Sequence, residues 1–263
     1  MHNGHASLLS RSRAMPALLP EGIDRHVVAV DIALFTIQDE SLKVLLVKRA
    51  APPFPGWWSL PGGFVGRAES VDEAALRELQ EETGITIVYL EQLYTFGDLD
   101  RDPRGRVISV SYYALVDWER FQLKAHTSAK DGSSATKIGR SASGGKPAGT
   151  RWFAVNRLPT VAFDHRKIVA SALERLRNKV NYTSAAFQLL PKKFTLSELQ
   201  RAYEVILGQP LDKRNFRKKM LQLGILKDTR ERQLEGRQRP ARLYAFTEAR
   251  VIKLQEKGII VPF

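Results

Sequence analysis

The sequence contains no cysteine among its 263 residues. Disulfides, thiol nucleophiles and cysteine-ligated zinc are therefore excluded, which is consistent with a reducing compartment, and we expect a cytoplasmic protein. No apolar run reaches the roughly 20 residues that a membrane-spanning helix needs. We therefore expect no membrane contact. We interpret residues 1–22, which contain only short apolar pieces, as a disordered tail rather than a signal peptide.

Large apolar side chains are almost missing from residues 126–149, which read HTSAKDGSSATKIGRSASGGKPAG. A segment of this composition cannot bury enough apolar surface to fold, so we interpret it as a mobile loop. Glu is also missing from residues 126–150, and Asp131 is the one acid there.

Positive charge is abundant and unevenly distributed. The net charge is +13, and residues 182–263 contain 17 Lys and Arg against 8 Asp and Glu. This asymmetry favours a nucleic-acid partner for the C-terminal part, with a merely solubilising basic surface as the alternative.

Residues 23–180 alternate between strand and helix patterns. We expect helices from Ser70 to the glycine Gly84 and over DHRKIVASALERLRNKV, because caps and apolar periodicity mark them. We expect strands in HVVAVDIALFTI, LKVLLVKRA, ITIVYLEQLYTFG, VISVSYYALVDW and RWFAV, the first two forming a hairpin. The order indicates a mixed α/β sandwich.

Residues 181–263 have a different pattern. Thr195 and Glu198 form a capping box that opens one helix, and LDKRNFRKKMLQLG forms a second, capped by Asp212 and ended by Gly224. Two strands around an Arg-rich turn and a closing helix, TEARVIKLQEKG, follow. Helix, turn, helix, hairpin and helix is the order of a winged helix-turn-helix domain.

The second of these helices has the composition of a DNA-reading element. Phe216, Met220 and Leu223 form its apolar stripe, while cations lie on another face and in the following turn. Arg suits bidentate contact with guanine, and cations in a wing suit phosphates. A protein-interaction module with solvated cations is the alternative. The predicted DNA-binding residues are Lys213, Arg214, Arg217, Lys218, Arg232, Arg237 and Arg239.

An acidic helix stands out in this basic chain: residues 63–85, GFVGRAESVDEAALRELQEETGI, hold five Glu and one Asp. Glu81 and Glu82 lie three and four residues after Glu78, so Glu78 and Glu82 share a face with Glu81 beside them, and the three repel one another. A divalent cation would offset that repulsion, and a solvated acidic face is the alternative. We expect these three acids to be exposed.

The same segment matches every position of the Nudix box, and WSLPGGF leads into it as in many Nudix proteins. The chain from about 23 to 180 therefore resembles the Nudix family. The resemblance implies an α/β/α sandwich that handles a nucleoside diphosphate linked to another group. Glu78, Glu81 and Glu82 would bind Mg²⁺ or Mn²⁺, with Glu78 and Glu81 catalytic if the protein hydrolyses. Gly63, Glu69, Arg77 and Gly84 would be structural.

The resemblance and the residue types together suggest a ligand site. The predicted ligand-binding residues are Arg49, Gly62, Gly63, Arg101 and Arg104, since Arg matches phosphate geometry. Arg106 could act likewise, or this DRDPRGR stretch could be only a polar hairpin tip. Trp57 and Trp58 could stack on adenine or pack locally. His165 could contact ligand, although a structural role with Asp164 is the simpler interpretation.

A Nudix domain followed by a winged helix resembles the NrtR family of Nudix-related transcriptional regulators of NAD metabolism. Stretches such as VAFDH and FTLSELQRAYEVILGQPLDKRNFRKKMLQLGIL look like that family's. The resemblance implies a homodimeric, ADP-ribose-responsive repressor of NAD biosynthesis or salvage genes, which binds an inverted-repeat operator in double-stranded DNA.

Two enzymatic alternatives stay open. A Mg²⁺-dependent pyrophosphatase that cleaves ADP-ribose to AMP and a sugar phosphate is favoured by the complete box. The charge of the C-terminal part and the loop without Glu count against it. An RNA-processing Nudix hydrolase would also use a basic surface, although a winged helix with an Arg-rich wing suits duplex DNA better.

Overall fold

The computed structural model describes residues 25–85, 89–118, 149–180, 185–233 and 240–247. The expected tail 1–22, loop residues 126–148, Arg237, Arg239 and the helix expected after Phe246 lie outside these ranges. No helix within them combines the length and apolar character needed to cross a membrane.

A mixed sheet forms the centre of the N-terminal domain. Its main path runs β3-β2-β1-β6-β5, while β4 pairs with β1 and β7 with β2. β1 and β2 form the predicted hairpin, and β1 runs parallel to β6, starting with Val27 opposite Val107. The strands are β1 (Val27–Gln38), β2 (Ser41–Lys48), β3 (Trp58–Ser59), β4 (Gly62–Phe64), β5 (Tyr89–Phe96), β6 (Val107–Leu115) and β7 (Thr150–Ala154).

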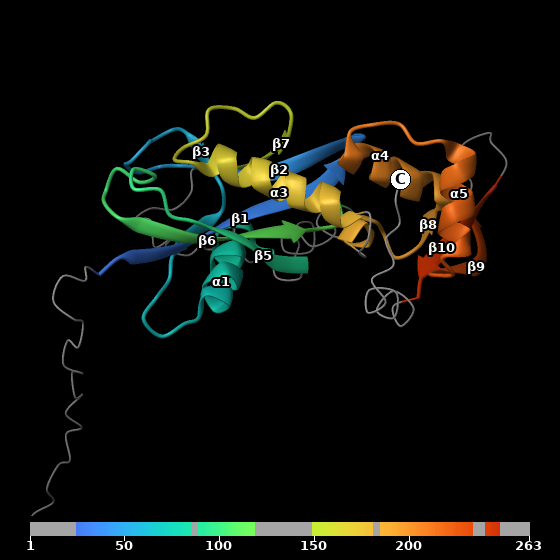
Figure 1. Cartoon of the computed structure of the whole chain (residues 1–263), viewed down its shortest axis with the longest axis horizontal. Helices are drawn as coiled ribbons and strands as arrows, with labels where there is room; N and C mark the ends of the chain where they lie inside the picture. Colours follow the sequence, from blue (N-terminus) through green and yellow to red (C-terminus); the bar gives the residue numbers. More distant parts are fainter. Residues whose placement is uncertain (1–24, 86–88, 119–148, 181–184, 234–239, 248–263) are drawn as a thin grey trace, which may run out of the picture.

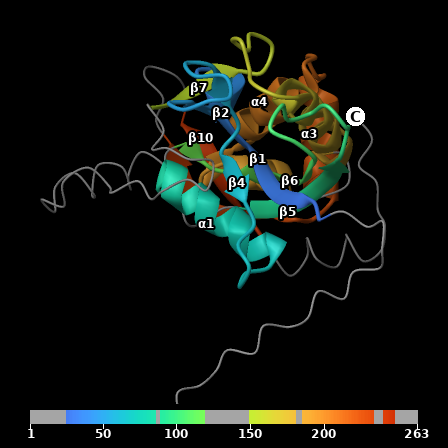
Figure 2. The ribbon, with the colours of Figure 1, turned by 90° about the vertical axis from the view of Figure 1, so that its left-hand side faces the viewer.

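Two helices cover opposite faces of this sheet, α1 (Val71–Thr83) on one side and α3 (His165–Val180) on the other (Figures 1 and 2). Side chains alternate along a strand, so β1 serves both faces. Its residues Ile32 and Leu34 pack in the cluster that includes α1, while Phe35 packs in the cluster that includes α3. The expected α/β/α sandwich is confirmed.

The C-terminal part has the predicted winged-helix order, with a three-stranded sheet in the order β8-β10-β9. Strand β8 was not expected from the sequence. The predicted capping box of Thr195 and Glu198 is present, and Asp212 caps the second helix as predicted. The elements are η1 (Ala185–Leu189), β8 (Phe194–Thr195), α4 (Leu196–Leu207), α5 (Lys213–Gln222), β9 (Leu226–Gln233) and β10 (Ala241–Phe246).

One apolar core joins the two parts. Leu176 and Val180 of α3 belong to the same buried cluster as Tyr203 and Ile206 of α4 and Phe216 of α5. Figure 1 shows α3 running along the sheet toward α4. The expected boundary near residue 180 is therefore a boundary of sequence pattern, across which packing is continuous.

Candidate functional site

The acidic helix α1 begins and ends as the sequence predicts. The Ser70 side chain accepts a hydrogen bond from the Glu73 backbone N–H, and the Glu73 side chain accepts one from the Ser70 N–H. Gly84 ends the helix in the left-handed region, with φ of 72°. These caps satisfy the end groups of α1 and fix where its acids lie relative to the sheet.

Arg77 ties α1 to the segment before it. Its Nε and Nη2 donate to the two carboxylate oxygens of Glu69 at 2.9 and 2.7 Å, and Nη2 also donates to the Phe64 carbonyl at 3.2 Å. Hydrogen bonds from Arg77 and from the Gly66 N–H lower the pKa of Glu69 to about 2. This geometry supports the orienting role predicted for Glu69 and Arg77.

The three acids of the box are not equally exposed. Glu78 is 0% and Glu82 5% exposed, so the expectation of three exposed acids is wrong for this pair, because the helix presses that face onto β4. Arg77 Nη1 lies 2.7 Å from Glu78 Oε1 and 3.4 Å from Glu81 Oε2. The Arg77 guanidinium thus offsets part of the repulsion for which a divalent cation was the expected partner.

Glu78 retains one notable atom. Its Oε2 is buried and has no hydrogen-bond partner, and burial raises the pKa of this carboxyl despite the opposing effect of Arg77. A buried carboxylate oxygen without a partner suits a cation. Among the described residues, however, no three His, Asp or Glu side chains are grouped so that they could hold a metal.

Strand β4 approaches α1 closely because it carries two glycines. A Cβ at Gly63 would meet Glu78 Oε1 at 2.1 Å, and one at Gly62 would meet the Val30 carbonyl at 2.1 Å. The Gly62 N–H donates to Glu82 Oε2 at 3.0 Å. Gly63 therefore sets the spacing between the acidic helix and β4, while Gly62 allows β4 to lie close to β1 and donates to the helix.

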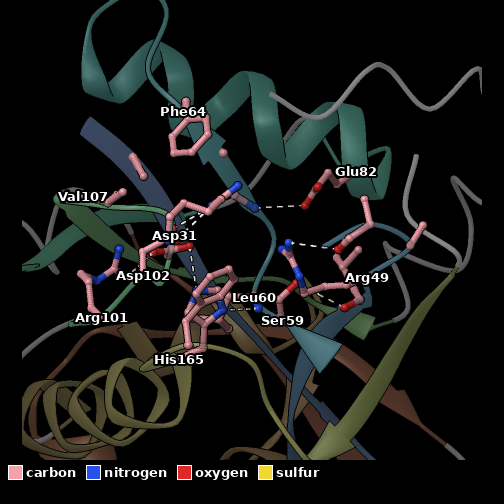
Figure 3. A pocket seen from close by; sticks show the side chains of 18 of the residues that line it. Asp31, Arg49, Ser59, Leu60, Phe64, Glu82, Arg101, Asp102, Val107 and His165 are labelled. Carbon is pink, nitrogen blue, oxygen red and sulfur yellow. Dashed lines mark hydrogen bonds and ion pairs between the residues drawn. The ribbon is translucent and has the colours of Figure 1, made fainter. Parts of the chain in front are cut away.

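A pocket opens beside this contact (Figure 3). Glu82 enters from α1, His165 comes from the opposite side, and Asp31 lies between them. Every predicted ligand-binding residue lines it: Arg49, Gly62, Gly63, Arg101 and Arg104.

Arg101 makes internal ion pairs at the base of the pocket. Its side chain is 3% exposed, and it donates to Asp164 at 2.8 and 3.0 Å and to Asp31 at 3.1 Å. Burial alone would raise the pKa of Asp31, but His165, Arg101 and Ser109 together hold it well below its usual range. The prediction that Arg101 holds a diphosphate is therefore disfavoured by geometry, since its guanidinium already serves two carboxylates.

His165 makes structural contacts, with a different partner from the one expected. Its Nδ1 accepts a hydrogen bond from the Leu60 N–H at 2.8 Å, and its Nε2 lies 3.2 Å from Asp31 Oδ1. The simpler interpretation, a structural role, is consistent with these contacts, but the partner is Asp31 rather than Asp164. The Nε2 proton therefore points at Asp31, and the ring links α3 to the segment between β3 and β4.

Arg49 and Arg104 are the predicted cations that remain for a ligand, and the exposed Lys48 lines the pocket as well. Arg49 donates to the backbone carbonyls of Pro53 and Ala51, and no described carboxylate forms an ion pair with it. Burial and then the charge of Arg104 lower its pKa. Arg104 pairs with Asp102 at 2.7 Å. Asp31 is already paired with Arg101, so these two neighbouring guanidiniums, with Lys48, face Asp102 and Glu82, and the arginines favour an anion.

The remaining aromatic and basic candidates are placed differently. Trp58 packs against Phe153, whereas Trp57 is exposed and packs on Phe54. Neither tryptophan is among the residues that line the pocket. Arg106 donates to the Gly97 carbonyl, which agrees with the polar-hairpin interpretation.

The basic face of α5 is largely as predicted. Lys213, Arg214 and Lys218 are exposed, while Phe216 and Met220 are buried. Arg217 departs from the expected outer face: it is half-buried and donates to Ser197 Oγ at 3.1 Å, because it faces the start of α4. Arg232 is exposed on β9.

Sequence reasoning missed Asp31, Asp102 and Phe163. Asp31 had a usable signal, since it is a lone acid inside the apolar strand run VVAVDIALF. Asp102 lies in a stretch that we considered only for its arginines. Phe163 was visible in VAFDH, but its place at the pocket depends on contacts between distant segments.

Comparisons with known families agree with this geometry. Residues 25–172 match the NUDIX domain, and residues 186–246 match the NrtR DNA-binding winged helix domain. An ADP-ribose pyrophosphatase of Methanocaldococcus jannaschii is 38% identical over 138 residues, which cover 52% of this chain and 70% of that protein.

Two relatives span both domains. The ADPR responsive transcriptional repressor NtrR of Acinetobacter baylyi is 35% identical over 224 residues, covering 84% of this chain and 82% of that protein. The crystal structure of Shewanella oneidensis NrtR complexed with a 27mer DNA is similar with a TM-score of 0.69 and 36% identity, covering 86% of this chain and 95% of that one. With a Nudix domain and this winged helix packed on one core, the chain belongs to the NrtR family.

Proposed function

We propose that this protein is an ADP-ribose-responsive repressor that binds DNA upstream of NAD biosynthesis or salvage genes. The observation that carries the proposal is one packed unit containing both an anion-favouring pocket and an exposed basic helix. The printed function of the Acinetobacter baylyi relative, which aligns over both domains, supports it.

The ligand's diphosphate is assigned to Arg49 and Arg104. Arg49 is half-buried and donates its hydrogen bonds to backbone carbonyls, so an anion would pair with a charge that has no ion pair to a described carboxylate. Gly62 and Gly63 line the same pocket, and their missing side chains let β1 and the acidic helix lie close beside it. Arg101 instead positions the start of α3 through Asp164.

A divalent cation, Mg²⁺ or Mn²⁺, is proposed at the acidic helix. The donor chemistry fits, because Glu78 Oε2 is buried without a partner and Glu82 lies one turn away on the same helix, beside the pocket. Glu78 and Glu82 would hold the ion with assistance from Glu81, after a movement of these side chains, since the described acids are not grouped for a metal as they stand. When bound, it would offset the charge of a diphosphate.

Helix α5 is proposed to read the major groove of duplex DNA, with Arg214 and Lys218 nearest to the bases. We propose that the protein acts as a homodimer, so that two copies bind an inverted repeat. Their recognition helices would then lie about 34–36 Å apart, or a multiple of that distance.

The deciding experiment is a gel shift on the gene's own upstream DNA, with and without ADP-ribose and Mg²⁺. We expect ADP-ribose to weaken binding of the wild type. Glu82→Gln keeps an oxygen acceptor for the Gly62 N–H, so we expect a folded protein that binds ADP-ribose more weakly in calorimetry. DNA binding that ignores ADP-ribose would contradict the proposal.

A second function, ADP-ribose pyrophosphatase, is favoured by one observation: the box is complete and its Arg77–Glu69 clamp is formed. Glu78 and Glu81 would then be catalytic. We expect turnover to be slow or absent, since residues 126–150 supply no Glu. The measurement is release of AMP and ribose 5-phosphate. A rate constant on the order of 1–10³ s⁻¹ would make this an enzyme of ordinary efficiency.

A further inference from the structure

Phe163 has an unusual backbone at the mouth of the pocket. Its φ of 55° lies in the left-handed region, which a bulky residue adopts only when its surroundings hold it there. It lines the pocket and stands two residues before His165, where α3 begins. A strained residue therefore joins the ligand site to a helix.

The two cations assigned to the ligand both lie over the ring of Phe163. The Arg49 Cζ atom is 4.8 Å and the Arg104 Cζ atom 5.7 Å from the ring centroid. Arg49 is the closer of the two, since the Arg104 Cζ atom lies nearer to the ring of Phe64, at 5.0 Å. Guanidiniums over an aromatic face are attracted by its quadrupole. An anion in the pocket would compete with the ring for these same guanidiniums, because a charge attracts them more strongly than a quadrupole does.

The segment that follows Phe163 is anchored at both ends. Near the pocket, Asp164 receives two hydrogen bonds from Arg101, and His165 holds the Leu60 N–H. α3 is 16 residues long, about 24 Å at roughly 1.5 Å per residue, and its last turns reach the winged helix. There the Arg177 Nε donates to the Ile206 carbonyl, in the last turn of α4, at 3.0 Å.

We infer that Phe163 relays the occupancy of the pocket to the DNA-binding domain. In the structure the guanidiniums of Arg49 and Arg104 hold its ring, and with it the left-handed start of α3. A diphosphate that draws these cations away releases that restraint, and α3 passes the change to α4 through their shared core. This inference rests on the proposed function, and it assigns the coupling to one side chain.

The relay is tested by a substitution that leaves a bulky side chain at the positive φ of residue 163 but removes the aromatic ring and its quadrupole. Phe163→Leu is compared with the wild type in full-length protein, by measuring DNA affinity without ligand and with saturating ADP-ribose and Mg²⁺. For the wild type we expect the DNA affinity without ligand to exceed that with ligand by a ratio of roughly 5–150, the usual range of allosteric coupling. Phe163→Leu lacks the ring that the cations hold, so we expect its DNA affinity without ligand to fall to that of the ligand-bound wild type, with a ratio near 1. Calorimetry confirms saturation.

Two further variants separate the quadrupole from general packing. Phe163→Trp retains an aromatic face that binds cations at least as well, so it should preserve the wild-type ratio. Phe54→Leu is the matched control. Phe54 also has a positive φ, of 62°, and packs edge-on against Phe163 with centroids 5.1 Å apart, yet no guanidinium lies over its ring among the described residues. It too should keep the ratio.

The outcomes are distinguishable. A wild type that binds DNA equally with and without ADP-ribose overturns the proposed function itself. A wild type that responds, with Phe163→Leu responding as strongly, overturns only the role of Phe163. If Phe163→Leu does not fold, amide hydrogen exchange of the wild type, measured with and without ADP-ribose, tests the relay instead. We expect ADP-ribose to change exchange in 163–170 and 196–207, and unchanged exchange in 163–170 would refute the relay.

Discussion

In the Nudix pocket, Arg101 is buried between two carboxylates, whereas Arg214 on α5 is exposed and forms no ion pair with any described residue. The same side chain therefore serves two purposes in one molecule. A buried, paired guanidinium fixes the position of neighbouring segments, because removing it would strand two buried charges. An exposed one leaves the fold unaffected and remains available to a polyanion. The following substitutions test this difference.

Arg101→Met should have the largest effect. It removes the partner of Asp31 and Asp164 while keeping much of the apolar stem, and breaking a buried pair in this way costs about 3–5 kcal/mol. Urea unfolding at neutral pH measures the loss in free energy of unfolding. The matched change Arg214→Met should alter that free energy by less than about 0.5 kcal/mol. Equal losses would remove the distinction between the two arginines.

Arg214→Ala should mainly affect DNA. If Arg214 reads a base, its loss costs about 1–3 kcal/mol per site on the operator and relaxes preference at one symmetric pair of positions. Arg217 donates a hydrogen bond to Ser197, so Arg217→Ala should weaken binding to operator DNA and to scrambled DNA alike. Arg232→Ala should lower the salt slope by about 0.9 if it contacts one phosphate. Binding to both DNAs at several salt concentrations separates these cases. If Arg217→Ala rather than Arg214→Ala loses the preference for operator over scrambled DNA, then Arg217 reads the base and Arg214 does not.

Glu69→Gln tests a pair that is neither buried nor fully exposed. Because Arg77 and Gly66 hold the pKa of Glu69 near 2, below its ordinary value of 4.5, its contribution is present above pH 4.5 and is lost as the pH falls toward 2. We expect a loss of about 1 kcal/mol at pH 7, the upper end for partly exposed pairs, and little difference from the wild type near pH 2. Urea unfolding across this range measures it. A loss that persists at pH 2 would point to packing rather than charge.

Glu40→Gln should have the smallest effect. Glu40, at the tip of the β1–β2 hairpin, pairs with Arg201 of α4, and both side chains are mostly exposed. Exposed pairs contribute about 0–1 kcal/mol, so thermal unfolding should scarcely change. A shift above about 1 kcal/mol would show that this contact carries part of the domain interface.

Local signals in the sequence predict the elements well and their assembly poorly. Ser70, Gly84, Thr195 and Asp212 mark helix ends, since caps act within a few residues of their own position. The box places Glu78 and Glu82 on one face, but their burial depends on β4 approaching through Gly62 and Gly63.

Contacts between distant segments account for the rest. Arg101 meets Asp31 and Asp164 across 70 and 63 residues, and no spacing rule reaches that far. As an arginine, Arg101 was predicted to bind phosphate, but in the fold its guanidinium pairs with two carboxylates. Similarly, the periodicity of α5 separates buried from exposed residues correctly except at Arg217, where the neighbouring helix α4 decides.

The core shared by α3 and α4 has a consequence for protein engineering. Regulators with separable domains can be recombined by exchanging one module at the linker. Here the buried face formed by Tyr203 and Ile206 is matched to Leu176 and Val180. A chimera that gives this sensor a new DNA specificity should therefore keep α4 and replace only the exposed surface of α5 and the wing. Grafting a foreign winged helix after residue 180 would pair two surfaces that do not fit together.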